Sequence, residues 1–357
     1  MRIVQVGAGT VGAAVVRRFL SVREHWCDVH HVDTGYAGLL DSRGGVLNPN
    51  CISDSGLQEL LLRKADGRSL AEAEGGIRAR PIEALERLGS LGDVVLVDCA
   101  VGEETYDAVL AVLASGGSAV LSNKAPLAVS QDRYDELQAA GRSGALRYEA
   151  TVGAGLPVIS TLHSLLDTGD EVLEIQACAS GTLGYITSEL MAGKPYSAAV
   201  RQARALGYTE PDPRDDLSGV DVARKALILA RTCGRRLELD EVHIEPLLPA
   251  LDPSLSVEEF LEALPEGDRE FAERAERARA SGNVLKYVTT IPADGEVSVA
   301  LEEAPAASRI GSLEGADNIF LFRTRQYLDH PLAIIGPGAG PENTAMGVLS
   351  DLLQVAR

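Results

Sequence analysis

The sequence feature that most constrains the fold is a glycine-rich turn near the start of the chain. Residues 2–6 are mostly apolar and predict a short buried strand, and the next six residues read G-x-G-x-x-G: Gly7, Ala8, Gly9, Thr10, Val11 and Gly12. Apolar residues at helical spacing follow. In this context the glycines permit a tight turn and close approach of a pyrophosphate, and the helix N-terminus faces the phosphates. The segment predicts a dinucleotide site; an ordinary glycine turn is the alternative.

The strand that follows this helix can be assigned in two ways. Residues 28–33 end in Asp33, an acid about 20 residues after the last glycine, which would favour the ribose hydroxyls of NAD. Residues 36–40 lead instead into Asp41, Ser42, Arg43 and Gly44. We prefer this second segment, because Arg43 could then meet the 2′-phosphate of NADP or stack on the adenine; a solvated loop arginine is the alternative. The choice between NADP and NAD stays open, with NADP preferred.

Later segments of the first 150 residues continue an alternation of strands and helices. We expect helices over residues 57–64, 81–88, 103–114 and 132–140, and strands over residues 93–100, 118–121 and 146–150. The strand at 118–121 delivers Ser122, Asn123 and Lys124 to its carboxyl end, where open α/β sheets bind ligands. These three residues are therefore candidate cofactor contacts, and a loop lysine in water is the alternative.

Composition limits the possible partners. The formal net charge is −19, which argues against nucleic acid and anionic membranes, since both require basic surfaces. The 5 cysteines form no C-x-x-C pair, as is usual for reduced cytoplasmic thiols. We find no secretory signal pattern and no apolar run of about 20 residues. The expectation is a cytoplasmic protein with a small-molecule substrate.

A second polar segment lies at residues 210–225. Five acidic side chains precede one lysine, Lys225: they are Glu210, Asp212, Asp215, Asp216 and Asp221. Prolines at 211 and 213 predict an extended loop, and a helix should begin near residue 221 with Ser218 or Asp216 as its cap. Asp221 and Lys225 then share one helical face. Because this chain uses arginine for most of its positive charge, a retained lysine suggests a point charge with a tunable pKa. A solvated ion pair is the alternative.

This segment resembles the homoserine dehydrogenases. The resemblance rests on Gly207, Tyr208, Glu210, Asp212, Pro213, Asp216, Gly219, Asp221 and Lys225, and is strongest with the short monofunctional members. Two further stretches are similar to the family: Gly181, Thr182, Tyr185 and Ile186, and the string from Glu149 to Pro157. The resemblance covers nearly the whole chain, and we expect no regulatory domain and no fused kinase.

The resemblance implies an α/β fold with two domains. A Rossmann-type doubly wound parallel sheet should occupy residues 1–150, completed by residues 327–357, with the strand at 331–335 returning to it. A second, α+β domain over residues 151–326 should bind substrate and form a homodimer through its sheet. Strands are expected there at 172–180, 284–291, 297–301 and 318–325, and helices at 195–206 and 221–233.

The implied activity is reversible hydride transfer between NAD(P) and C4 of L-aspartate 4-semialdehyde, giving L-homoserine for threonine, methionine and isoleucine biosynthesis. Of Lys225 and Lys124, one would act as general acid and base and the other would polarise the oxygen or position the nicotinamide; we favour Lys225 for the proton. Asp221 would orient the lysine or bind the substrate hydroxyl, and Asp216 would support the lysine. By the same resemblance Glu210 binds the substrate ammonium group, and Thr182, with Gly181 and Tyr208, completes the substrate site.

The family pattern also implies cofactor and cation contacts. Asn123 and Lys124 would lie beside the nicotinamide, and Gly340 and Thr344 would approach the cofactor from the opposite side. Relatives often carry a hydroxyl residue where this chain has Ala100, so only backbone contacts are expected there. A monovalent cation such as sodium would be held by Glu149 and by the carbonyls of Val152, Ala154 and Leu156. A metal-free hinge is the alternative.

Two other functions compete with this one. An aspartate-semialdehyde dehydrogenase would need a nucleophilic cysteine, but Cys99 and Cys178 fall inside expected buried strands. A cofactor-binding sensor with an inactive site is the second rival.

Overall fold

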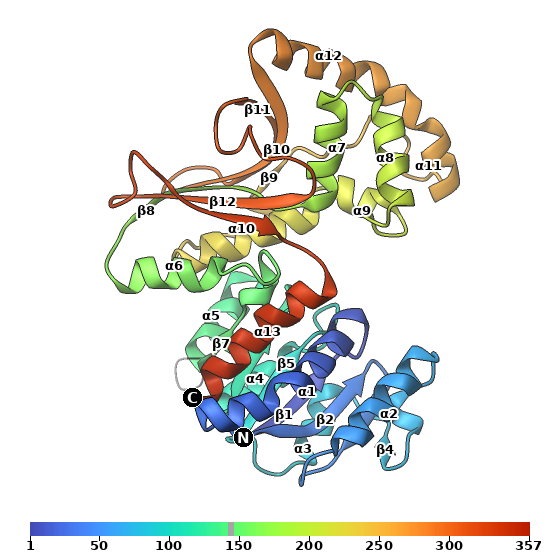
Figure 1. The fold of residues 1–357 in the computed structure, drawn as a ribbon, viewed down its shortest axis with the longest axis vertical. Helices are drawn as coiled ribbons and strands as arrows, with labels where there is room; N and C mark the ends of the chain where they lie inside the picture. The colour runs from blue at the N-terminus through green and yellow to red at the C-terminus, as the bar shows by residue number, and fades with distance from the viewer. Residues whose placement is uncertain (142–145) are drawn as a thin grey trace. The chain divides into compact units, whose positions relative to one another are not determined.

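The computed structural model describes residues 1–141 and 146–357, which form two compact units. The first unit contains Met1–Pro157 and Ala339–Arg357, and the second contains Val158–Gly338. Each unit has its own sheet and its own helices (Figure 1). Among the described residues, no helix has both the length and the apolar character needed to cross a membrane.

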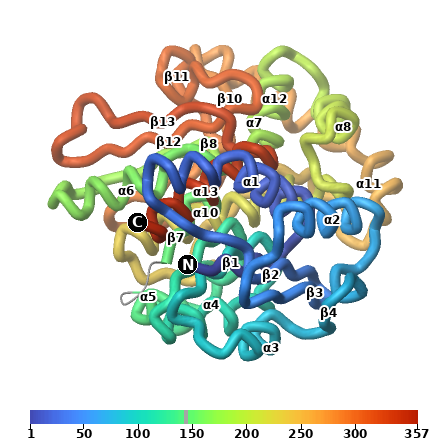
Figure 2. The backbone as a smooth tube through the Cα atoms, turned by 60° about the horizontal axis from the view of Figure 1, so that its bottom comes forward, coloured from blue at the N-terminus to red at the C-terminus, as the bar shows by residue number. Residues whose placement is uncertain are grey.

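The first unit is built on a sheet in the order β4-β3-β2-β1-β5-β6-β7. Its strands are β1 (Arg2–Val6), β2 (Gly35–Asp41), β3 (Gly44–Leu47), β4 (Gly76–Ile77), β5 (Val94–Asp98), β6 (Ser118–Leu121) and β7 (Leu146–Arg147). β1 pairs in parallel with β2 on one side and with β5 on the other, and β3 and β4 extend the edge as antiparallel strands (Figure 2). The strand order therefore reverses at β1 and β5, where doubly wound sheets bind their ligands.

Helices cover this sheet because each has one apolar stripe. They are α1 (Thr10–His30), α2 (Asp54–Ala65), α3 (Pro81–Glu86), α4 (Tyr106–Ala114), α5 (Gln131–Gly141) and α13 (Pro341–Ala356), with single 3₁₀ turns at Leu70–Glu72, Ala125–Leu127 and Glu149–Thr151. α1 and α13 lie side by side (Figure 1), and Phe19 and Trp26 of α1 share a core with Val348 and Leu352 of α13. The last helix of the chain thereby completes the first unit.

The second unit contains a mainly antiparallel sheet in the order β13-β12-β8-β10-β11-β9. Its strands are β8 (Val172–Cys178), β9 (His243–Ile244), β10 (Asn283–Pro292), β11 (Ser298–Pro305), β12 (Asp317–Thr324) and β13 (Leu332–Pro337). Its helices are α6 (Val158–Asp167), α7 (Gly181–Met191), α8 (Tyr196–Ala205), α9 (Pro213–Leu217), α10 (Val220–Thr232), α11 (Val257–Ala263) and α12 (Asp268–Ala280), with 3₁₀ turns at Leu239–Glu241 and Leu264–Gly267. α7, α10 and α12 all pack against β10. The buried residues of α10 include the apolar stripe predicted for residues 221–233: Val222, Ala223, Ala226, Leu227 and Ala230.

Two sequence predictions about strands in the first unit are corrected. Residues 28–33 are not a strand, because α1 continues to His30 and ends with His31 in the left-handed conformation (φ 57°). The preferred alternative is confirmed, since β2 covers residues 36–40. The strand expected over 146–150 ends at Arg147, because Glu149 begins a 3₁₀ turn and donates its backbone N–H to Asp351 (2.8 Å).

The predicted position of the strand near residue 331 is also wrong. β13 pairs antiparallel with β12, from Asp317 opposite Pro337 to Phe322 opposite Leu332, so it belongs to the second sheet. Only α13 and the residues just before it return to the first unit. The chain changes units after Gly338, about a dozen residues later than expected.

The acidic segment is more helical than its prolines suggested. Pro213 occupies the first turn of α9, where a missing amide costs little, and Asp212 caps that helix by accepting the Arg214 N–H (3.0 Å). The N-cap position of α10 is Gly219, at φ 74°, but the hydroxyl of the preceding Ser218 accepts the Val220 N–H (3.3 Å), so Ser218 caps the helix from one residue earlier and Asp216 does not cap it. A Cβ at Gly219 would lie 2.2 Å from the Tyr287 hydroxyl, which explains why glycine stands there.

Candidate functional site

The glycine turn of the first unit has the geometry that a dinucleotide requires. Gly7 adopts φ 97°, and a Cβ there would lie 2.3 Å from the carbonyl oxygen of Cys99. A Cβ at Gly12 would lie 2.0 Å from the Gly7 carbonyl oxygen, whereas a Cβ at Gly9 would meet nothing within 4 Å. Two glycines therefore allow close backbone packing, and the third leaves open space. Gly9 and Thr10 are exposed at the start of α1, where free amides can receive phosphates.

A buried glutamine that sequence reasoning missed braces this turn. Gln5 is fully buried in β1, and its Nε2 donates to the carbonyls of Gly7 (2.8 Å) and Gly12 (2.9 Å). Its Oε1 accepts the Tyr36 hydroxyl (2.8 Å). The available signal was a single polar residue inside an otherwise apolar strand, because a buried amide must find partners.

The loops after β5 and β6 meet at the same edge of the sheet. The Ser122 amide donates to the Asp98 carbonyl (2.9 Å), and the Asn123 side chain donates to the Asp98 carboxylate (3.1 Å) and to the Gly102 carbonyl (2.8 Å). Ala100 donates its amide to the other Asp98 oxygen (2.9 Å). The predicted cofactor residues Ala100, Ser122 and Asn123 are thus brought together, and Lys124 continues the same loop.

At the end of β2 the acidic side chain of Asp41 is buried, whereas the basic side chain of Arg43 is exposed. Asp41 is buried and accepts hydrogen bonds from Lys64 Nζ (2.8 Å) and from the amides of Arg43 (2.8 Å) and Leu70 (3.3 Å). Burial acts to raise the pKa of Asp41, but these donors outweigh it and lower that pKa. The carboxylate is therefore engaged inside the fold, while the Arg43 side chain is exposed.

The start of α13 supplies a second glycine approach. Gly340 adopts φ 102°, and a Cβ there would meet nothing within 4 Å. Thr344 donates its hydroxyl to the Gly340 carbonyl (2.9 Å), within its own helix. Gly340, a predicted cofactor contact, therefore has free space beside it. The hydroxyl of Thr344, the other predicted contact, is hydrogen-bonded to the backbone carbonyl of Gly340.

In the second unit, Lys225 is held at the end of β8. Its Nζ lies 3.0 Å from the Asp221 carboxylate and donates to the Ala179 carbonyl (2.7 Å). The Lys225 side chain is 13% exposed, whereas that of Asp221 is 49% exposed. A cation fixed by a carboxylate and a carbonyl has at least one N–H left for a third partner, since an ammonium group carries three. The predicted pairing of Asp221 with Lys225 is present.

Thr182 and Asp216 organise the loop that carries the other predicted substrate residues. The Thr182 hydroxyl donates to the Tyr208 carbonyl (2.5 Å) and lies 3.1 Å from Asp216 Oδ1, while Asp216 Oδ2 accepts the Glu210 N–H (2.8 Å). Burial first, and then Asp221 and Asp215, raise the pKa of Asp216. Its hydrogen bonds run to Thr182 and Glu210, so Asp216 supports this loop rather than touching the lysine. The Glu210 side chain is left exposed.

One aromatic contact in this loop was not anticipated. Tyr185, which follows Thr182 on α7, packs edge-on against Tyr208 at 5.1 Å between ring centroids. Tyr208 is 45% exposed, so the pair forms an aromatic wall with one face open to solvent.

One of the candidate cation residues, Glu149, lies beside a second buried carboxyl group, that of Asp351. Glu149 and Asp351 are both buried, and burial together with the charge of Glu149 raises the pKa of Asp351 to about 7. Ala154 adopts a left-handed conformation (φ 56°), and its carbonyl oxygen lies so close to Gly347 that a Cβ there would approach within 2.4 Å. Within the described residues, no group of three or more His, Cys, Asp and Glu side chains could hold a metal ion. Carboxylate and carbonyl oxygens are the ligands that hard cations prefer, and the cation at Glu149, Val152, Ala154 and Leu156 stays a prediction.

Cys99 and Cys178 lack the properties of a nucleophile. Burial raises the pKa of Cys99 and of Cys178 to about 12 in each case, so both thiols are protonated at neutral pH. This disfavours the aspartate-semialdehyde dehydrogenase alternative.

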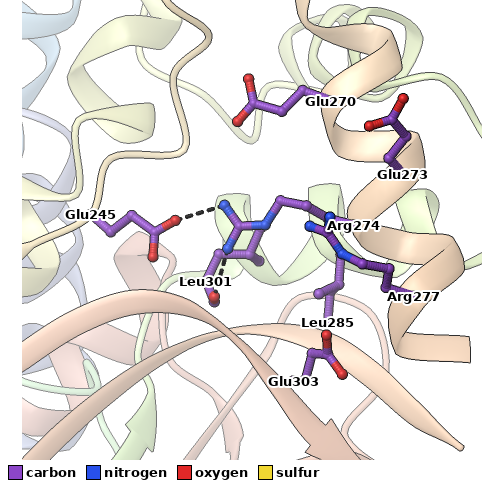
Figure 3. Close-up of a pocket in the computed structure, with 8 residues that line it drawn as sticks. All are labelled: Glu245, Glu270, Glu273, Arg274, Arg277, Leu285, Leu301 and Glu303. Carbon is purple, nitrogen blue, oxygen red and sulfur yellow. Dashed lines mark hydrogen bonds and ion pairs between the residues drawn. The ribbon is translucent and has the colours of Figure 1, made fainter. Parts of the chain in front are cut away.

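A hollow of about 430 Å³ lies elsewhere in the second unit, between α12 and the strands β10 and β11 (Figure 3). Arg274 points into it and is engaged by Glu245 (2.6 Å) and by the Leu301 carbonyl (2.9 Å). None of the predicted site residues lines it. Its wall is dominated by charged side chains, unlike the mainly apolar walls of most small-molecule sites.

Comparisons with known proteins find homoserine dehydrogenases similar to this chain over most of its length. A homoserine dehydrogenase family profile matches residues 157–353, and a profile for the NAD binding domain of homoserine dehydrogenase matches residues 7–149. The chain is 44% identical over 283 residues to a homoserine dehydrogenase of Emericella nidulans, covering 74% of this chain and 76% of that protein.

Longer and more distant proteins are also similar. Over 359 residues the chain is 37% identical to the chloroplastic bifunctional aspartokinase/homoserine dehydrogenase 2 of Arabidopsis thaliana. That match covers 98% of this chain but only 38% of the plant protein. The fold also matches a hyperthermophilic archaeal homoserine dehydrogenase in complex with NADPH, with a TM-score of 0.76, 23% identity, and coverage of 99% of this chain and 97% of that one.

Proposed function

The chain belongs to the homoserine dehydrogenase family, and on this premise we propose that it catalyses the reversible oxidation of L-homoserine to L-aspartate 4-semialdehyde. The family makes it an NAD(P)-dependent oxidoreductase. The observation that carries the proposal is the setting of Lys225, whose Nζ is fixed by Asp221 and the Ala179 carbonyl beside the loop of Thr182 and Asp216.

Lys225 is the residue we assign to the proton. When bound, the oxidised nicotinamide supplies the acceptor for the hydride leaving C4 of homoserine. In this direction the neutral amine of Lys225 takes the hydroxyl proton and becomes an ammonium group; in the other direction that ammonium group returns the proton to the carbonyl oxygen. Asp221 holds the ammonium group in place, so that the developing charge on the substrate oxygen meets a fixed donor. Lys124, at the end of β6, is assigned to positioning the nicotinamide or polarising the oxygen.

The amino-acid part of the substrate is assigned to the start of α7 and to Glu210. The first amides of α7, at Gly181 and Thr182, suit the carboxylate, because a helix N-terminus favours negative charge. The exposed carboxylate of Glu210 can form an ion pair with the substrate ammonium group. Tyr208, which packs against Tyr185, would cover this ion pair from one side. Asp216 acts through this loop, by holding the Glu210 amide and Thr182.

For the coenzyme we propose a preference for NADP. An acid at the end of β2 would favour NAD by binding the ribose hydroxyls, but Asp41 is already occupied by Lys64 and two backbone amides. The neighbouring Arg43 is exposed and can pair with a 2′-phosphate. Gly7, Gly9, Thr10, Val11, Gly12 and Gly340 are assigned to the pyrophosphate and ribose.

Assembly, cation and cellular context are also proposals. A homodimer through the sheet of the second unit is supported by Ile335 on β13, which is 53% exposed. A monovalent cation at Glu149 and the carbonyls of Val152, Ala154 and Leu156 is supported by the buried pair of Glu149 and Asp351, which a cation would neutralise. We assign the reaction to threonine, methionine and isoleucine biosynthesis in the cytoplasm, in keeping with the free state of every cysteine.

The test is reduction of NAD⁺ and NADP⁺ with L-homoserine at alkaline pH, for the wild type and Lys225→Ala in parallel. We expect turnover in the wild type, faster with NADP⁺, and a loss of about 10³-fold in kcat/KM in the variant with coenzyme binding intact. Lys225→Arg keeps the charge but not the geometry and serves as the matched control. Coenzyme binding without turnover in the wild type would favour the inactive sensor.

A further inference from the structure

A buried carboxylate at the carboxyl end of β5 has no role in the reaction described above. Asp98 is fully buried, and no arginine or lysine forms an ion pair with it among the described residues. The Asp98 carboxylate accepts three hydrogen bonds: from the backbone amide of Ala100 (2.9 Å), the Thr105 hydroxyl (2.6 Å) and the Asn123 carboxamide (3.1 Å). A buried charge without a counter-ion is costly, and such a group usually persists because it serves function or specifies one conformation.

We propose that Asp98 is a positioning residue for the reaction: its carboxylate locks the loop of Ser122, Asn123 and Lys124 to the loop of Ala100 at the coenzyme edge of the sheet. This inference rests on the proposed function, because the two loops matter only if the coenzyme binds there.

The contacts of Asn123 show how the lock reaches Lys124. Asn123 Nδ2 also donates to the Gly102 carbonyl (2.8 Å), and its Oδ1 accepts the amide of Ala125 (3.1 Å). Lys124 lies between the residue that Asp98 holds and the residue that Asn123 holds. The backbone on both sides of Lys124 is therefore anchored to one carboxylate.

The other side of the lock reaches the glycine turn. Asp98 fixes the amide of Ala100, and the preceding residue, Cys99, donates its own amide to the Val6 carbonyl (2.8 Å). The Cys99 carbonyl is the atom that a side chain at Gly7 would strike. Since this chain has alanine at position 100, the loop is held there through its backbone, and Asp98 is the group that holds it.

Asp98 also gives the lock a pH dependence. Burial raises the pKa of Asp98 to about 6, although Thr105, Ala100 and Asn123 oppose that shift. Protonation removes the negative charge and converts one acceptor oxygen into a hydroxyl, so the three contacts that the carboxylate accepts are weakened. The other ionisable side chains around it are Cys99, whose thiol stays protonated, Glu104 against Gly102, and Lys124 on the loop itself.

The decisive experiment compares matched threonine variants. Thr105→Val removes one donor to Asp98 and should raise its pKa, whereas Thr105→Ser keeps the hydroxyl. Thr324→Val is the control, because Thr324 is equally buried and donates to Asp170 over the same 2.6 Å, in the second unit. For each protein the Kd of NADPH is measured by fluorescence titration from pH 5 to pH 8, with kcat/KM for homoserine and the unfolding midpoint beside it.

We expect wild-type affinity for NADPH to weaken as pH falls through about 6. That transition should move to higher pH in Thr105→Val, return in Thr105→Ser and stay in place in Thr324→Val. Asp98→Asn, which sets an amide against three donors, should weaken NADPH binding about tenfold at pH 8 and flatten the pH profile. Glu104→Gln should leave the profile unchanged.

Other outcomes would overturn the inference. If Thr105→Val and Thr324→Val lose only stability, with the same NADPH pH profile as the wild type, Asp98 is a structural residue. The same conclusion follows if Asp98→Asn binds NADPH as the wild type does. A wild type that binds NADPH without oxidising homoserine defeats the proposed function alone, because the binding profile still tests Asp98. A wild type that binds neither NADPH nor NADH defeats both.

Discussion

The coenzyme edge of the first unit (the glycine turn at residues 7–12 and the loops after β5 and β6) and the acidic loop of the second unit (residues 210–225) differ in how their polar side chains are exposed and paired. At the coenzyme edge the polar side chains are buried and form hydrogen bonds with other protein groups; they belong to Gln5, Asp98 and Asn123. In the acidic segment at residues 210–225 the Glu210 side chain is exposed, and the Asp221 side chain is 49% exposed and paired with Lys225. The polar side chains of the first region therefore contact the protein itself, whereas in the second region the Glu210 carboxylate faces solvent. A coenzyme common to many enzymes needs a rigid backbone surface, and a small zwitterion needs charged partners.

The largest effect should come from the backbone of the coenzyme edge. Gly7→Ala places a Cβ at φ 97° against the Cys99 carbonyl, so we expect a loss of about 3 kcal/mol in unfolding free energy and of NADPH binding. Gly9→Ala, at an open position, should keep wild-type stability. Denaturant unfolding and NADPH titration of both variants measure this, and equal stability of the two would contradict it.

The exposed carboxylate of Glu210 in the acidic loop should contribute to the affinity for the substrate. Glu210→Gln removes the proposed partner of the substrate ammonium group, so we expect KM for homoserine to rise about 30-fold while the Kd of NADPH is unchanged. The neighbouring Asp215 is exposed as well, and Asp215→Asn is the matched control. Steady-state kinetics decide the matter; a similar KM in both variants would mean that the loop acts only through its net charge.

Stability should depend on pH in the first unit through Asp351. Its folded pKa of about 7 lies above the ordinary 3.8, so the folded state binds the extra proton and wild-type stability falls as pH rises through that window. Asp351→Asn keeps an acceptor for the Glu149 amide and removes the titration. Relative to the wild type, the variant should gain about 2 kcal/mol between pH 4 and pH 8 in sodium-free buffer.

The same pair of proteins also tests the cation. If sodium binds beside Glu149, adding NaCl in place of choline chloride should stabilise the wild type at pH 8 more than Asp351→Asn. Parallel pH curves for the wild type and the variant would show instead that Asp351 does not titrate in this range.

The smallest effect should fall on coenzyme choice. Arg43→Ala leaves Asp41 paired with Lys64 and removes only an exposed guanidinium, so the ratio of kcat/KM for NADP⁺ to that for NAD⁺ should drop about tenfold. Ser42→Ala is the control in the same turn. An unchanged ratio in Arg43→Ala would assign the choice of coenzyme to another residue.

Sequence patterns predicted the elements with clear periodicity and failed where a single tertiary contact decided the outcome. The strand at 118–121 and the helix over 221–233 follow from apolar spacing alone. The strand at 331–335 was predicted correctly as a strand but assigned to the wrong sheet, because its partner, β12, is set by pairing and not by its own residues. The N-cap position of α10 was not predicted, because Gly219 is required there by the Tyr287 hydroxyl, far along the chain, and Ser218 caps the helix from one residue earlier.

What the sequence determined by itself is the set of residues whose chemistry is local. Glycines at a tight turn, and an acid four residues before a lysine on one helix, are readable because backbone conformation and helical spacing act over a few residues. What only the tertiary structure decided is which buried polar groups meet. Asn123 reaches Asp98 across 25 positions, Thr182 reaches Asp216 across 34, and Glu149 reaches Asp351 across 202. Such partners are chosen by which strands and loops become neighbours, and a buried polar group accepts any neighbour that satisfies it.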